Sequence, residues 1–240
     1  MITLRRASER HHYQRGRQED WLTFDPHDRA DPLAHGFGTL ALLNEIRIAP
    51  GTDVVRSPRD DVEILTYIHQ GVLRYDDSTS RRGILQAGEF HRATFGPSPR
   101  HSKMKVSRTH WAHFYELWLN PSAADLAAEQ VQRRFSVADR RGRLCVVASP
   151  DARQGSLRIC EDALIYSALL NPGQHMAREL PYGRNAWLHV VLGAIVLGDA
   201  VLTAGDGAGI AEERAISFAA RETSEVLLVD LGGSRATVPT

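Results

Sequence analysis

The stretch that decides the fold is "YIHQGVLRY" (Tyr67–Tyr75), followed by "LQAGEF" (Leu85–Phe90). A strand-like run ends at a glycine, a second run follows, and a Leu-x-Ala-Gly-acid turn precedes a third. The same order returns later as "VVLGAIVLG" (Val190–Gly198) and "LTAGDG" (Leu202–Gly207). Glycine permits the tight turn, and the acid precedes the next strand. Two such matches in one strand context predict a duplicated β domain.

Strand-like segments separated by turn residues fill most of the remaining chain. The first half contains "GTLALLNEIRI", "DVEILTYI" and "HWAHFYELWL", and the second half contains "RLCVVA", "SLRICEDALIYSALL" and "EVLLVDL". Short strands at intervals of about ten residues indicate an all-β sandwich or barrel. Between the halves, "PSAADLAAEQVQRRF" (Pro121–Phe135) is rich in alanine and resembles a capping box at Ser122 and Asp125. We therefore expect a short helical linker there.

Composition and charge exclude several classes of protein. Of the 240 residues 42% are hydrophobic and 24% are charged, which is ordinary for a globular protein. Lys+Arg and Asp+Glu both number 29, so no global field favours nucleic acid or an anionic membrane. No apolar run approaches a transmembrane span, and the start has no signal-peptide core. Cys145 and Cys160 suit two buried thiols in a reducing compartment, so we expect a cytoplasmic protein without nucleic-acid or membrane partners.

Several segments together resemble the pirin family of bicupins. They are "LRRASERHH", "WLTF", "DVEILTYIHQG", "LQAGEF", "RHS" and, most specific, "SPDARQGSLRI" (Ser149–Ile159). The resemblance implies an all-β bicupin of two stacked cupin (jelly-roll) β-barrels joined by a short linker. It implies an N-terminal cupin domain over residues 1–121, a linker over 122–140 and a C-terminal cupin domain over 141–231. Residues 232–240 are expected to be a disordered tail.

The resemblance also implies where a metal would bind, in the N-terminal barrel. The family's ligands are three histidines and one glutamate. Counting from Gly51, the His-x-His places hold Ser57 and Arg59. The later His-x-Glu unit, counted from Gly88, reads His101-Ser102-Lys103. Only His101 keeps its ligand type.

The chemistry of these side chains opposes a metal. A neutral hydroxyl is a poor ligand, guanidinium has no accessible lone pair, and ammonium cannot coordinate before it loses its proton. A unit positive charge 4 Å from a divalent cation opposes it by roughly 8 kcal/mol at an effective dielectric of 20. We therefore expect no metal cofactor at this place. The alternative is one divalent transition metal (Fe, Cu, Ni, Mn or Zn) at a relocated site near His91, His110 and His113, which we expect instead to be structural.

Residues two apart on a strand share a face, so Ser57, Arg59, His101 and Lys103 are predicted to line one ligand pocket. Its two cations need partners if they are buried. Three arrangements remain open: internal ion pairs, a small bound anion such as a carboxylate, phosphate or enolate, or side chains directed to solvent. The candidate internal partners are Asp61, Glu63 and Glu116.

Three classes of function follow. By resemblance the chain is related to quercetin 2,3-dioxygenases, but the changed ligand places predict that this activity is lost. No catalytic residue is assigned; the remaining enzyme hypothesis is a metal-free Lys103 acting as a base or nucleophile. A small-anion binding or stress-related accessory protein is the second class. The third is a protein that acts by binding another protein, which rests on the resemblance alone. The oligomeric state does not follow from the sequence.

Overall fold

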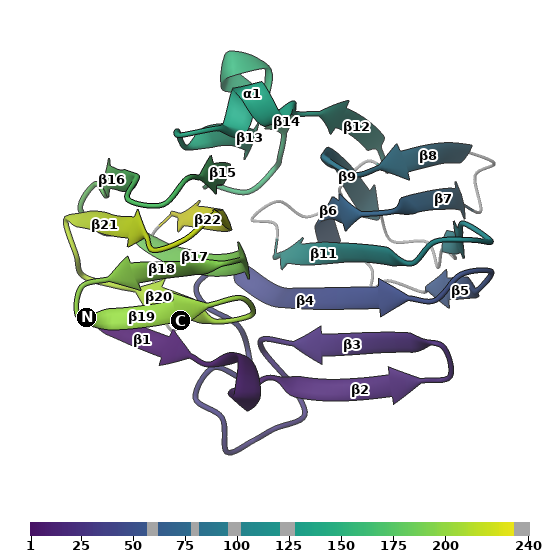
Figure 1. The fold of residues 1–240 in the computed structure, drawn as a ribbon, viewed down its shortest axis with the longest axis horizontal. Helices are drawn as coiled ribbons and strands as arrows, with labels where there is room; N and C mark the ends of the chain where they lie inside the picture. Colours follow the sequence, from purple (N-terminus) through teal and green to yellow (C-terminus); the bar gives the residue numbers. More distant parts are fainter. Residues whose placement is uncertain (57–61, 78–81, 96–101, 121–127, 233–240) are drawn as a thin grey trace, which may run out of the picture.

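The structure is a computed structural model that describes residues 1–56, 62–77, 82–95, 102–120 and 128–232. It consists of two β-barrels lying side by side, each made of a seven-stranded and a four-stranded sheet (Figure 1). The all-β prediction is confirmed. Ser57, Arg59, Asp61 and His101 lie outside the described residues, as does the predicted tail from residue 233 onward.

The first barrel, coloured from purple to teal in Figure 1, pairs its described strands in antiparallel fashion. Its large sheet has the order β12-β9-β6-β11-β4-β3-β2, and its small sheet has the order β5-β10-β7-β8. The strands are β2 (His11–Arg15), β3 (Gln18–Leu22), β4 (Leu40–Ile48), β5 (Asp53–Arg56), β6 (Val62–Gln70), β7 (Val72–Asp77), β8 (Arg82–Gln86), β9 (Glu89–Phe95), β10 (Ser102–Val106), β11 (Ala112–Leu119) and β12 (Gln130–Arg134).

The second barrel, green to yellow in Figure 1, also includes the first strand of the chain. Its sheets have the orders β1-β20-β17-β22-β15-β13-β14 and β16-β21-β18-β19. The strands are β1 (Ile2–Arg5), β13 (Cys145–Ser149), β14 (Leu157–Arg158), β15 (Ala163–Leu170), β16 (His175–Glu179), β17 (Asn185–Leu192), β18 (Ala194–Leu197), β19 (Ala200–Thr203), β20 (Gly207–Ile210), β21 (Ala215–Ala220) and β22 (Ser224–Leu231).

Strand β1 pairs with β20, so a segment inside the range predicted for the N-terminal domain completes the other barrel. The register joins Ile2 to Ile210 and Arg5 to Gly207. This pairing covers an edge of the large sheet that would otherwise expose unpaired backbone groups. The chain then passes through the short 3₁₀ turn η1 (Ala7–Glu9) into the first barrel.

The two predicted Leu-x-Ala-Gly-acid turns share the same hydrogen bonds and backbone conformation. Gly88 donates its backbone N–H to Ile68 O at 2.9 Å, and Gly205 donates to Val190 O at 2.8 Å. The acid after each glycine caps its own turn: Glu89 accepts from the backbone N–H three residues before it, and Asp206 does the same. Both glycines have a positive φ, +86° and +88°. The two halves therefore use the same strand–turn–strand unit.

The linker differs from the helix expected over Pro121–Phe135. Gln130–Arg134 forms strand β12, which pairs with β9, while residues 121–127 lie outside the described ranges. A helix does occur in the linker, but later, as the single turn α1 (Val137–Arg140), which Ser136 caps by accepting from the Asp139 N–H. Pairing with the free edge of β9 satisfies a row of backbone groups and so overrides the local helix preference.

One hydrophobic core runs through the interface between the barrels. Phe24 packs edge-on against Trp187 with ring centroids 4.7 Å apart, and both side chains are fully buried. The same cluster continues through Leu65 and Tyr67 of the first barrel to Val229 of the second. The second barrel thus completes the core of the first. No helix in the described ranges is long and apolar enough to cross a membrane.

Candidate functional site

A cavity lies inside the first barrel, between its two sheets. Strands β6, β9, β11 and β12 supply one wall, and β7, β8 and β10 supply the other. Its volume is about 30 Å³, which is room for one or two water molecules rather than a flavonoid. The lining is mostly apolar, with Ile64, Leu85, Phe95 and Met104 among it.

Polar side chains in the cavity come mainly from the large sheet. Glu116 is 1% exposed and accepts a hydrogen bond from Trp118 Nε1 at 3.1 Å. His91 packs against the ring of Tyr75 with centroids 4.7 Å apart, and Thr66 also faces the cavity. Of these, only Glu116 was predicted for the pocket. Thr66 was missed because strand β6 is buried on both faces, so its sequence does not alternate between apolar and polar residues.

Lys103 is placed differently from the prediction. It is exposed on β10, while its neighbour Met104 is the residue of that strand that lines the cavity. Alternate residues on a strand point to opposite faces, so the two side chains cannot both enter the barrel. The ammonium of Lys103 therefore lies on the outer surface. Ser57, Arg59 and His101 are outside the described residues, and their convergence stays a prediction.

Glu63 also faces away from the cavity. Its carboxylate accepts from Arg92 Nε at 2.8 Å and from the backbone N–H of Cys160 at 2.9 Å. Glu63 is completely buried and Arg92 nearly so. Because Cys160 follows β14 of the second barrel, Glu63 joins the barrels instead of neutralising a cation in the pocket. Asp61, the remaining candidate partner, lies outside the described residues.

Two further buried ion-pair networks lie at the interface. Glu225 of β22 accepts hydrogen bonds from Tyr67 and from Arg140 Nη1, and His69 Nδ1 lies 3.1 Å from it. Burial raises the pKa of Glu225, but the bonds to His69 and Tyr67 and the charge of Arg140 outweigh this and lower it overall, so the carboxylate is ionised. The network fixes the barrels relative to each other and leaves this carboxylate fully engaged.

Glu45 organises the second network. It lies 2.8 Å from His113 Nε2 and accepts from Arg10 Nη2 at 2.8 Å. Burial of Glu45 acts to raise its pKa, but the bonds to His113 and Arg10 lower it to about 2. The structure thus gives His113 the buried hydrogen-bond partner that a structural histidine needs. Within the described ranges, no group of three or more His, Cys, Asp or Glu side chains is arranged to hold a metal ion.

Comparison with protein families places both halves of the chain. The family model described as Pirin matches residues 4–119, and the model described as the quercetinase C-terminal cupin domain matches residues 146–231. A protein of Escherichia coli (strain K12) named quercetin 2,3-dioxygenase is 35% identical over 231 residues, covering 96% of this chain and 99% of that protein. A pirin-like protein of Caulobacter vibrioides is 28% identical and covers 90% of this chain and 94% of its own length.

Solved structures agree with the sequence comparisons. The crystal structure of YhhW from Escherichia coli superposes with a TM-score of 0.90 at 34% identity, covering 97% of this chain and 98% of that one. The bacterial pirin YhhW in complex with nickel(II) superposes with a TM-score of 0.89 at the same identity, covering 97% and 100%. The two-barrel architecture is thus that of a bicupin.

Proposed function

This chain belongs to the pirin family, among bicupins related to quercetin 2,3-dioxygenase, and from that premise we propose that its first barrel has lost the family metal site and the dioxygenase activity with it. In place of metal chemistry, we propose that the protein binds a small anion and works as an accessory protein. The observation that supports the loss of the metal site is the set of side chains found at the family's ligand positions.

The residues present do not fit a divalent metal. Ser57 and Arg59 replace two imidazoles, and Lys103 replaces the carboxylate. Neither guanidinium nor ammonium offers a lone pair to a cation. The exposure of Lys103 on β10 and the pairing of Glu63 with Arg92 support the proposal, because neither residue brings a ligand group to the cavity. Among the described residues, the carboxylate and the imidazole that line the cavity are those of Glu116 and His91, which do not stand at the family's ligand places.

The anion-binding part of the proposal rests on the surroundings of Lys103. An open hollow of about 330 Å³ lies on the outer face of β7 and β10. Four basic side chains and one acidic side chain line it: Lys103, Lys105, Arg74, Arg82 and Asp76. Arg82 pairs with Asp76 at 3.1 Å, and Lys105 pairs with Asp53 at 3.3 Å. Lys103 and Arg74 have no ion-pair partner among the described residues. Excess positive charge at one surface hollow attracts small anions, more strongly at low salt.

Metal content is the first test. Protein purified without a histidine tag is incubated with nickel, iron, copper, manganese or zinc, desalted and analysed by mass spectrometry, and quercetin turnover is assayed in parallel. We expect substoichiometric metal and no turnover. Near-stoichiometric metal with turnover would establish the alternative, a quercetin 2,3-dioxygenase-like enzyme, which the 35% identity to the Escherichia coli protein favours.

Anion binding is tested separately, by thermal shift with phosphate and acetate at low and at physiological salt. A ligand present at 100 times its Kd stabilises the folded state by about 2.7 kcal/mol. Lys103→Met should remove the phosphate-dependent shift, whereas Arg221→Met, which removes an exposed cation from the second barrel, should keep it. Equal shifts in both variants would exclude the Lys103 hollow as the binding site.

A further inference from the structure

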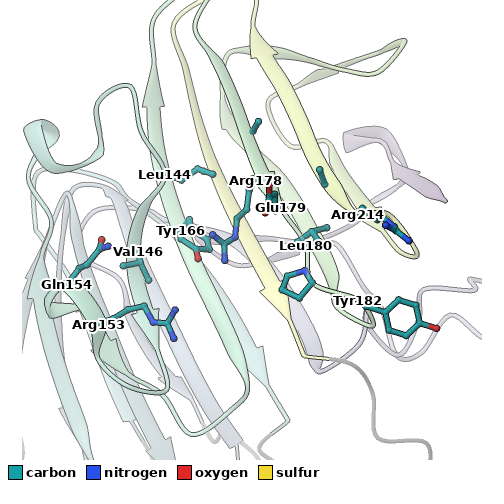
Figure 2. A pocket seen from close by; sticks show the side chains of 13 residues that line it. Leu144, Val146, Arg153, Gln154, Tyr166, Arg178, Glu179, Leu180, Tyr182 and Arg214 are labelled. Atoms are coloured by element: carbon teal, nitrogen blue, oxygen red, sulfur yellow. The ribbon is translucent and has the colours of Figure 1, made fainter.

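An open cleft of about 1190 Å³ lies on the second barrel, for which the sequence predicted no ligand site (Figure 2). Strand β16 borders it on one side, and β13 and β15 border it on the other. Among the described strands β16 pairs only with β21, so within that part of the chain the two sheets of the barrel are not joined there. Val146 and Leu180 give the cleft apolar walls, and Tyr166, Arg153, Arg178 and Arg214 give it polar groups.

Arg178 and Tyr166 form a stacked pair in the cleft. The guanidinium carbon of Arg178 lies 4.5 Å from the centroid of the Tyr166 ring. Two of its nitrogens, Nε and Nη2, donate to Asp230 Oδ2 at 3.1 and 2.9 Å, and Asp230 is fully buried. The third, Nη1, makes no hydrogen bond within the described part of the chain. A buried carboxylate thus holds the guanidinium plane and leaves one N–H edge for a ligand.

Tyr166 supplies a second unused donor. The residue is 6% exposed, yet its hydroxyl makes no hydrogen bond with any described residue and is not among the fully enclosed polar atoms. Burial raises the pKa of Tyr166, against the nearby charges of Arg178 and Arg153, so the hydroxyl is protonated at neutral pH. A buried phenol ordinarily finds a hydrogen-bond partner. Here the partner has to come from the cleft.

Arg153 comes from "SPDARQGSLRI", the most family-specific motif of the chain. The motif forms the 3₁₀ turn η2 (Arg153–Gly155). Ala152, which precedes the turn, and Gln154 within it both have left-handed backbone, with φ of +54° and +53°. Ser149 Oγ accepts from the Arg153 N–H at 3.2 Å, and Asp151 accepts from Arg153 Nε at 2.9 Å. The loop is therefore held by its own hydrogen bonds in a backbone that L-residues rarely adopt. Its result is to direct the free end of Arg153 along the cleft (Figure 2).

We propose that this cleft binds an aromatic carboxylate, whose carboxylate group accepts from Tyr166 Oη, Arg178 Nη1 and the Arg153 guanidinium while its ring lies against Val146 and Leu180. The charge argues for a monoanion rather than a phosphate dianion, because Arg178 and Arg153 already share their charge with Asp230 and Asp151. The apolar walls argue for a ring rather than a small hydrophilic acid.

The test is calorimetric titration of the full-length protein with benzoate, and with acetate and benzyl alcohol as probes that lack the ring or the charge. Benzoate should bind more tightly than either. Tyr166→Phe removes only an unbonded hydroxyl, so the variant should fold normally and bind benzoate about tenfold more weakly, as the loss of one hydrogen bond to a charged group predicts. Arg153→Gln should weaken binding similarly.

Two controls separate this site from the anion hollow of the first barrel. Lys103→Met and Arg221→Met should both leave benzoate affinity unchanged, even if Lys103→Met abolishes phosphate binding. The proposal is overturned if wild-type protein does not bind millimolar benzoate, or if Tyr166→Phe and Arg153→Gln bind it as well as the wild type does. Loss of benzoate binding in Lys103→Met alone would assign the ligand to the first barrel instead.

Discussion

Gly71 and Gly193 occupy the same turn in the two barrels, and each lies against a backbone carbonyl of the residue that directly precedes a neighbouring strand. A Cβ at Gly71 would lie 2.2 Å from the carbonyl oxygen of Trp111, and one at Gly193 would lie 2.3 Å from that of Thr223. The φ angles are +85° and +80°. Trp111 directly precedes β11, and Thr223 directly precedes β22. The duplication therefore extends to individual backbone contacts.

Alanine at either glycine should destabilise the protein. Gly71→Ala or Gly193→Ala combines left-handed backbone strain with displacement of a strand, so we expect the free energy of unfolding to fall by about 2–4 kcal/mol. Urea denaturation measures it. Gly198→Ala is the matched control, since Gly198 has a φ of +57° but nothing within 4 Å of its Cβ position. It should lose only about 1 kcal/mol, from the backbone strain. Similar losses of unfolding free energy in all three variants would show that the backbone near Trp111 and Thr223 moves away from the new Cβ with little loss of stability.

The Glu63–Arg92 pair should contribute strongly to joining the barrels. Glu63→Gln leaves the buried Arg92 guanidinium short of one charge partner, so we expect a loss of about 3 kcal/mol in the free energy of unfolding. The control is Asp53→Asn, which breaks the exposed pair with Lys105 and should change stability little. If both variants unfold at the same urea concentration, the buried Glu63–Arg92 pair contributes no more to stability than the exposed Asp53–Lys105 pair.

His189 should make stability depend on pH. The side chain is fully buried, both ring nitrogens lack a hydrogen bond within the described residues, and burial followed by the charge of Arg10 lowers its pKa to about 3. The unfolded chain takes up this proton near pH 6.5, which the folded protein resists. The contribution of His189 to stability is therefore complete above pH 6.5 and is lost as the pH drops toward 3, by roughly 5 kcal/mol.

His189→Leu should remove that part of the pH dependence and leave a shallower curve of unfolding free energy against pH. His175→Asn is the control, because His175 is exposed and lies 2.7 Å from Ser217 Oγ. It should keep the wild-type slope between pH 6.5 and 3. A wild-type slope in His189→Leu would mean that His189 is protonated in the folded protein.

The orientation of β10 can be tested by introducing the same charge at adjacent positions. Met104→Asp buries a carboxylate against the cavity wall and should cost about 2 kcal/mol or more. Lys103→Asp changes an exposed side chain and should stay within about 0.5 kcal/mol of the wild type. Thermal or urea unfolding of the two variants compares them directly. The opposite order would place Lys103 inside the barrel, as the sequence predicted.

Local sequence was sufficient for the strands and the repeated turns, and the resemblance to the pirin family supplied the two-barrel architecture. Alternation and glycine–acid turns act over a few residues, and the family motifs agreed with them. In the linker the local helix preference gave the wrong prediction, because Gln130–Arg134 forms a strand that pairs with the edge of β9. No local signal reports a pairing partner that lies about forty residues away in the sequence.

The candidate site likewise depends partly on residue type, which the sequence gives, and partly on long-range strand pairing. The sequence by itself determined which residue types stand at the ligand places, and hence that arginine and lysine oppose a cation there. Only the tertiary structure decided that Lys103 faces outward, that Glu63 binds Arg92, and that Tyr166, Arg178 and Arg153 meet in one cleft. The physical reason is the register of strand pairing. Alternation along a strand shows which side chains share a face, but long-range strand pairing decides which of the two faces is buried. A shift of the register by one residue exchanges the buried and the exposed face.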